Sequence, residues 1–135
     1  MPPTVSELLR QAPKTPDRLE EVDVSAFFGE PVVFKYRYPT VVMESIAANV
    51  DAPRLKRRHP DWSDQMCVLV SLLAQMHVEP PVGDEPPGIV YERIAVEHDP
   101  LFRFLVLEVS QRFPELRMAQ AVDEQKKGSN PTGGD

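Results

Sequence analysis

The sequence predicts a mainly α-helical α+β fold, in which a small N-terminal β-hairpin precedes a compact body of about four to five helices. Apolar residues recur at helical spacing through the second half of the chain, and strand-like alternation precedes them. Fifteen prolines among 135 residues break the chain into short elements. The length suits a single domain with flexible ends.

The segment 61–77, DWSDQMCVLVSLLAQMH, is predicted to be the central helix of this body. Steps of four and three residues separate the apolar positions of one helix face, which are Trp62, Met66, Leu69, Leu73 and Met76. Asp61 is the expected cap of the first turn, and the carboxylate of Asp64 favours a helix N-terminus.

Residues 1–19 are predicted to form a mobile N-terminal arm. A short amphipathic piece from Thr4 to Arg10 carries Val5, Leu8 and Leu9 on one side. Isolated helices of this length are marginal in water, so the piece needs a surface on which to dock.

Residues 20–114 are predicted to form one folded domain, which begins with a hairpin at 21–38. Glu21–Phe28 and Val32–Tyr38 alternate along the chain and are rich in valine, phenylalanine and tyrosine, a composition that favours strands. Gly29-Glu30-Pro31 is a suitable connection between them. A lone hairpin is not stable in water, so one face is expected to pack on the helices.

The helical body is predicted to span residues 40–113. Its first helix is expected at Thr40–Val50, and its expected inward side consists of Val41, Val42, Ser45, Ile46 and Val50. Asp51-Ala52-Pro53 is the expected end of this helix. After a proline-rich loop at 78–88, helices are expected at 90–96 and 101–113.

Asp99-Pro100 is a favourable start for the helix at 101–113, with Asp99 as its cap, and this helix should pack against the central one. Residues 115–135 are predicted to form a last amphipathic helix and a disordered tail.

Charge and composition exclude several classes of protein. The formal net charge of −6 argues against a nucleic-acid binder, because phosphates repel an acidic surface. The central helix is too short, and too polar at both ends, to span a bilayer, so no membrane association is expected. The N-terminus lacks the pattern of a signal peptide, and the single Cys67 suits a reducing compartment, so we expect a cytoplasmic protein.

No arrangement of residues indicates a catalytic site, a cofactor or a metal. A glycine-rich phosphate loop is missing, and Cys67 has the apolar neighbours of an inert core cysteine. The histidines lack the i, i+4 spacing of a helical metal site. A small enzyme whose site forms in space around His59, Asp61 and His98 is the alternative from a different class of protein.

Two features allow a partner-binding interpretation. Trp62 is either a half-buried residue at the start of the central helix or a contact with a partner, since tryptophan is enriched at interface hot spots. The basic run at 54–59 includes Arg57 and Arg58 and is either a solvated face or one end of a bipolar molecule. Copies of a bipolar molecule can self-associate head to tail.

The layout resembles the tail assembly chaperones of long-tailed phages and related prophage particles. The stretch from Pro60 through WSDQMCVLVSLLAQMHVEPP, and then GIVYERIAVEHDPLFRFLVLEVSQRFP, is similar to their helical body. Residues 21–38 are similar to their opening β segment, so the resemblance covers residues 20 to 115 as a pattern. It implies a non-enzymatic protein of the host-cell cytoplasm that binds the tape measure protein and keeps it soluble during tail tube assembly. The tail tube protein is a second partner that the resemblance suggests.

The predicted client-binding residues lie at the two weakly anchored ends of the chain. They are Val5, Leu8 and Leu9 in the arm and Leu116, Met118 and Val122 in the last helix. Each set is apolar on one side, as recognition of a helix in a groove requires. The rival hypothesis is a small structural component of the tail, such as a completion or connector protein.

Overall fold

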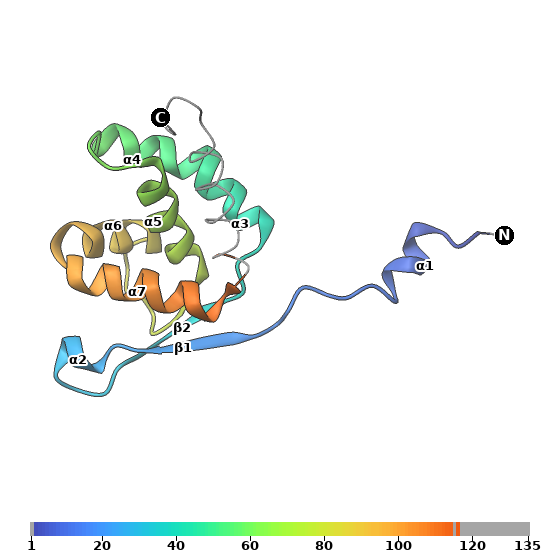
Figure 1. Cartoon of the computed structure of the whole chain (residues 1–135), viewed down its shortest axis with the longest axis horizontal. Helices are drawn as coiled ribbons and strands as arrows, with labels where there is room; N and C mark the ends of the chain where they lie inside the picture. The colour runs from blue at the N-terminus through green and yellow to red at the C-terminus, as the bar shows by residue number, and fades with distance from the viewer. Residues whose placement is uncertain (1, 115, 117–135) are drawn as a thin grey trace, which may run out of the picture.

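Helices pack on one face of a three-stranded antiparallel sheet in the computed structural model, which describes residues 2–114 and 116 (Figure 1). This arrangement confirms the predicted mainly α fold with a small N-terminal β segment. The hydrophobic core lies between the sheet and the helices above it. Within the described part of the chain, none of the helices combines the length and the apolar character needed to cross a membrane.

The sheet is built around its middle strand, β2 (Val33–Arg37). β1 (Leu19–Asp23) pairs with it in antiparallel fashion, which confirms the predicted hairpin. Val22 lies opposite Phe34, and both side chains are buried. β3 (His77–Glu79) pairs with the other side of β2. The sequence did not predict β3, because a strand of three residues is too short to show alternation.

The connection between β1 and β2 differs from the strand predicted at 21–28. The chain leaves the sheet after Asp23 and forms one helical turn, α2 (Ser25–Phe28). The Asp23 carboxylate accepts hydrogen bonds from the backbone N–H and the hydroxyl of Ser25, at 2.9 and 2.5 Å, and these bonds start the turn. Gly29 ends the turn with a φ of 70°, which glycine adopts without a steric penalty.

α3 (Val41–Ile46), a π-helical turn η1 (Ala47–Asp51) and α4 (Ala52–Arg58) follow one another without a break and form one rod. Thr40 caps the rod by accepting a hydrogen bond from the Met43 N–H at 3.2 Å. The predicted end of the helix at residues 51–53 is wrong. Pro53 lies directly after the π-helical turn, and the rod continues through it.

The inward side predicted for this rod is also wrong. Ala47, Ala52 and Leu55 face the core, and Met43 packs against it. The residues predicted to face inward are exposed, and they are Val41, Val42, Ser45, Ile46 and Val50. Periodicity identifies an apolar stripe on a helix, but it does not determine whether the core or a partner covers that stripe.

α5 (Asp64–Met76) is the central helix, although it begins after the predicted Asp61. Ser63 caps it in place of Asp61, because its hydroxyl accepts a hydrogen bond from the Met66 N–H at 3.0 Å. Of the predicted face, Met66 and Leu69 are only partly buried. The fully buried residues of α5 include Cys67, Val70, Leu72, Leu73 and Met76.

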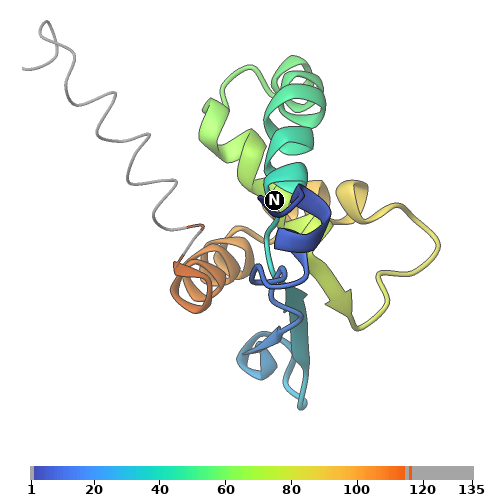
Figure 2. The same ribbon diagram turned by 90° about the vertical axis from the view of Figure 1, so that its right-hand side faces the viewer.

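α6 (Pro87–Glu97) packs on α5, and α7 (Asp99–Arg112) packs on α6 and β1. Figure 2 shows α7 and the loop that follows β3 projecting to opposite sides of the molecule. α5 and α7 both contribute buried residues to the hydrophobic core, and residues of both helices line an open groove. Asp99 is the first residue of α7 and binds Arg103 at 2.6 Å, so it is not the predicted cap.

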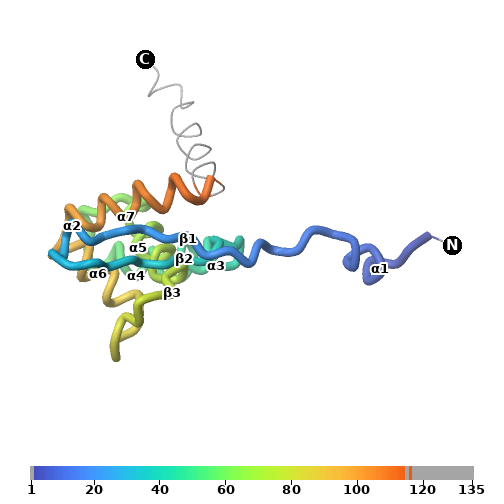
Figure 3. The backbone as a smooth tube through the Cα atoms, turned by 90° about the horizontal axis from the view of Figure 1, so that it is seen from below, coloured from blue at the N-terminus to red at the C-terminus, as the bar shows by residue number. Residues whose placement is uncertain are grey.

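α1 (Val5–Leu9) lies apart from this body, at the end of an extended segment (Figure 3). Thr4 caps the helix by accepting a hydrogen bond from the Glu7 N–H at 3.2 Å. No residue of α1 is buried. The arm therefore contains the short helix predicted from its sequence, but its apolar side is uncovered.

Candidate partner-binding surfaces

The arm presents the first apolar surface. Val5, Leu8 and Leu9 are 72%, 51% and 64% exposed, and the i, i+3, i+4 spacing places them on one side of α1. Ser6, Glu7 and the following Arg10 occupy the remaining surface of the helix. These three apolar residues are the predicted client contacts of the arm, and the structure leaves them accessible to a partner.

A second apolar surface, here termed the aliphatic strip, consists of Val41, Val42, Ile46 and Val50 on α3 and η1. Val41 and Val42 are 79% and 67% exposed, and Ile46 and Val50 are 40% and 43% exposed. A step of four residues rotates a side chain by slightly more than one full turn in an α-helix and by slightly less than one full turn in a π-helix. The two deviations therefore cancel along the rod. Val42, Ile46 and Val50 therefore stay nearly in line along the rod.

Polar contacts with α5 hold the rod behind the strip in place. The Ser71 hydroxyl donates a hydrogen bond to the Asp51 carboxylate at 2.6 Å. Gln75 donates from Nε2 to the Met43 carbonyl at 2.9 Å and to the Ser71 hydroxyl at 3.2 Å. These groups satisfy one another in a partly buried site, which fixes the orientation of α3 and η1.

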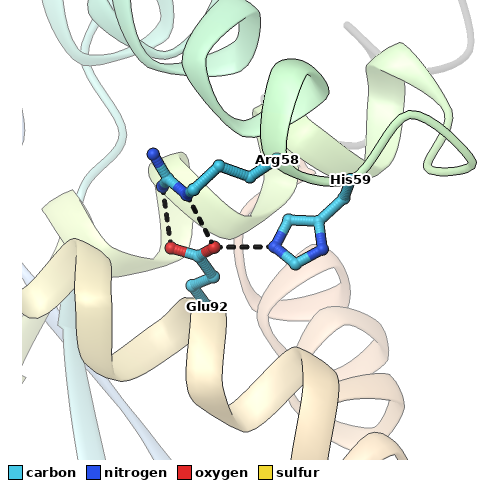
Figure 4. Close-up of polar contacts among 3 residues, drawn as sticks. All are labelled: Arg58, His59 and Glu92. Carbon is cyan, nitrogen blue, oxygen red and sulfur yellow. Dashed lines mark hydrogen bonds and ion pairs between the residues drawn. The ribbon is translucent and has the colours of Figure 1, made fainter.

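Arg58 and His59, at the end of α4, both bind Glu92 of α6 (Figure 4). Arg58 donates from Nε and Nη2 to the two carboxylate oxygens, at 3.0 and 2.8 Å, and His59 Nε2 lies 2.6 Å from Oε2. The hydrogen bonds from Arg58, together with that of His59, lower the pKa of the Glu92 carboxyl despite its partial burial. Arg58 therefore ties α4 to α6.

Trp62 stacks on His59, with the ring centroids 3.8 Å apart and the planes 10° from parallel. Its backbone carbonyl accepts a hydrogen bond from the Lys56 ammonium group, and its ring packs against the core cluster. This environment supports the interpretation of Trp62 as a half-buried packing residue. Arg57, by contrast, is exposed and forms no hydrogen bond or ion pair with another described residue.

An open apolar groove, here termed the α5–α7 groove, has a volume of about 530 Å³. Its apolar floor consists of Met66 and Leu69 from α5 and Phe102, Val106 and Leu107 from α7. A polar rim is formed by Asp99, Arg103 and Ser110. The sequence prediction missed this groove, because Met66 and Leu69 repeat at helical spacing like core residues and carry no signal of exposure.

A buried chain of hydroxyl and imidazole groups links the sheet to α6. The hydroxyls of Tyr36 and Tyr91 are 2.7 Å apart, and Tyr91 Oη lies 2.6 Å from His77 Nδ1. His77 Nε2 lies 2.5 Å from the Pro80 carbonyl oxygen, which can only accept, so the neutral ring carries its proton on Nε2. Nδ1 then accepts a hydrogen bond from Tyr91. Burial lowers the pKa of His77 and raises the pKa of both tyrosines, so all three are neutral near physiological pH.

Two of the predicted client-binding residues, Met118 and Val122, lie outside the described residues, as does the tail at 128–135. Leu116, the third predicted client-binding residue of the last helix, is only 4% exposed. Its backbone N–H donates a hydrogen bond to the carbonyl of Phe113, which is itself fully buried, so the core extends past the end of α7.

His59, Asp61 and His98 do not form a metal site in the described part of the chain. His59 binds Glu92, and no cluster of three or more histidine, cysteine, aspartate or glutamate residues in this part could hold a metal ion. Cys67 is fully buried, and burial raises the pKa of its thiol, as expected for a core cysteine.

Comparisons with known proteins do not identify a relative of this chain. No protein-family model matches it, and neither the curated proteins nor the solved structures include a detectably similar chain.

Proposed function

We propose that this chain is a non-enzymatic tail assembly chaperone of a long-tailed phage. It binds the tape measure protein and keeps that protein soluble while the tail tube assembles. The observation that carries the proposal is the aliphatic strip, which exposes four large aliphatic side chains along one rigid helical rod. Such a surface on a soluble domain is typical of a protein–protein contact.

The strip suits an amphipathic helix as its ligand. A client helix that lies along the rod can place its apolar face against Val42, Ile46 and Val50, in the manner of helix recognition by a groove or face. Valine and isoleucine are stiff at χ1, so they lose little side-chain entropy when a partner covers them. The contact is small, so each one is weak and reversible, which suits a protein that must release its client.

Co-expression tests this proposal. The tape measure protein is produced with the wild-type chain, with Val42→Glu or with Ile46→Glu, and its soluble fraction is measured after lysis. The matched control is Val96→Glu, because Val96 is 55% exposed on α6 and lies outside the strip. We expect the wild type and the control to raise the soluble fraction and both strip variants to fail. Circular dichroism checks that each variant is folded, and equal activity of the strip variants would contradict the proposal.

Mass spectrometry of purified particles separates this function from that of a structural tail component. A chaperone acts before the tail is complete, so the chain should be missing from finished tails. A stoichiometric amount in finished tails would instead assign it to the completion or connector proteins.

A further inference from the structure

α1 is a capped helix in which no residue is buried. Thr4 caps it, but its three apolar side chains are between 51% and 72% exposed. Helices of this length are unstable in isolation, because few backbone hydrogen bonds offset the entropy of ordering the first turn. The charged residues Glu7 and Arg10 project from the side opposite the apolar residues, so only one face of α1 is suited to burial.

The α5–α7 groove has the complementary shape and chemistry. It extends along α7 from Asp99 to Ser110, which corresponds to about 16 Å of helix, whereas α1 is about 8 Å long. Two helices form its floor, so a third helix can pack against both with ordinary interaxial spacing. Val5, Leu8 and Leu9 would meet a floor of methionine, leucine, phenylalanine and valine side chains, and the solvent face of α1 would stay in water.

Hydrogen bonds hold the chain where the arm joins β1, and from there the arm extends away from the helical body of the same copy. Arg18 donates a hydrogen bond to the Arg112 carbonyl at 3.2 Å, and Arg112 donates from Nε to the Glu21 carbonyl at 2.7 Å. Beyond this anchor, Pro13 and Pro16 favour an extended chain that acts as a spacer. Figure 3 shows the result, in which α1 lies well beyond the helical body.

We propose that α1 of one copy docks in the α5–α7 groove of a second copy, so that the protein self-associates through its N-terminal arm. The arm and the groove are different surfaces, so the contact is heterologous and can be repeated from copy to copy. It also leaves the aliphatic strip uncovered. If the proposed function holds, a chain of copies can hold one long client helix at several points, which strengthens binding without a new contact.

Light scattering over a range of protein concentrations provides the first test. The wild type should exceed the monomer mass of 15.3 kDa as concentration rises. Leu8→Glu in the arm and Leu107→Glu in the groove should each raise the dissociation constant by at least about tenfold, because each places a charge in the apolar contact. Ser6→Glu and Val96→Glu add the same charge outside the contact, and both should associate like the wild type.

The same measurement distinguishes this contact from head-to-tail association through opposite charges. Arg57→Glu reverses an exposed charge of α4 that lies outside both the arm and the groove. It should leave the wild-type mass unchanged, whereas association through the basic run would weaken. A wild type that stays monomeric at every concentration, or a Leu8→Glu variant that associates normally, would overturn the proposal.

Disulfide trapping provides the second test and identifies which copy the arm reaches. A Leu8→Cys chain is mixed with a Leu107→Cys chain under mild oxidation, while the native Cys67 stays buried and unreactive. A cross-linked pair of the two different chains is expected. If the mixture stays unlinked and a chain carrying both cysteines links only within itself, then the arm docks on its own body and the proposal is wrong. Neither test uses a client, so failure of the chaperone function would show only in the co-expression assay.

Discussion

Leu73→Ala and Leu69→Ala form a matched pair that tests which side of α5 supports the fold. Leu73 is 1% exposed, so its truncation leaves a closed cavity and should cost about 2–5 kcal/mol of unfolding free energy. Leu69 lies on the same helix but lines the open α5–α7 groove. Solvent and neighbouring side chains can fill the space that Leu69 leaves, so only part of the transfer free energy is lost, about 1 kcal/mol.

Urea unfolding followed by circular dichroism measures both effects, at low protein concentration so that separate copies are compared. For a slope of about 1.5 kcal/mol per molar urea, the midpoint should fall by about 2 M for Leu73→Ala and by less than about 1 M for Leu69→Ala. The slope itself should not change, which shows that the same surface is exposed on unfolding. Equal shifts, or a larger shift for Leu69→Ala, would refute the assignment of the buried face.

Three further predictions concern polar contacts between elements of the fold. Burial holds the pKa of His77 below that of an exposed histidine, so the unfolded chain binds more protons and stability should fall as pH drops below about 6.5. Urea midpoints at several pH values should show this fall, and His77→Gln should flatten it; an equally steep fall in the variant would contradict the role of His77. Tyr91→Phe leaves the Tyr36 hydroxyl and His77 without their partner and should cost about 1–3 kcal/mol, whereas Tyr36→Phe keeps the bond from Tyr91 to His77 and should cost less in thermal unfolding. Glu92→Gln should cost at most about 1 kcal/mol, because the Arg58 side chain is 54% exposed; this difference from the wild type should shrink in high salt, and a loss of about 3 kcal/mol would indicate a buried pair instead.

Features that depend on local sequence were predictable. The hairpin follows from alternation and α5 from helical spacing. Both patterns can be recognised from residues that are close together in the sequence. The errors at their ends are local as well. Asp61 and Ser63 are both good caps, and only the path of the chain around Trp62 selects Ser63. Asp23 and Ser25 divert the chain into α2 through a side-chain bond that competes with strand pairing.

Features that depend on distant contacts could not be predicted. Val42 and Leu73 belong to equally regular apolar stripes, yet one faces solvent and the other the core. The contact between His77 and Tyr91 joins residues whose types and spacing match no motif. The candidate surfaces share this difficulty, because an uncovered stripe and a buried stripe have the same sequence pattern, and only tertiary packing distinguishes them.

The π-helical turn has a consequence for how this chain tolerates a change in length. In η1 the Ala52 N–H bonds the Ala47 carbonyl, five residues back, so the turn accommodates one residue more than an α-helical turn. Deletion of Asn49 would let a uniform α-helix run through the rod and would leave α4 in nearly the same rotational position around its axis, because the π-helical turn had absorbed the extra residue. Leu55 would then still face the core and Arg58 would still reach Glu92. Among homologous sequences, a one-residue gap at this point should therefore occur without compensating changes of residue type at positions 55, 58 and 92.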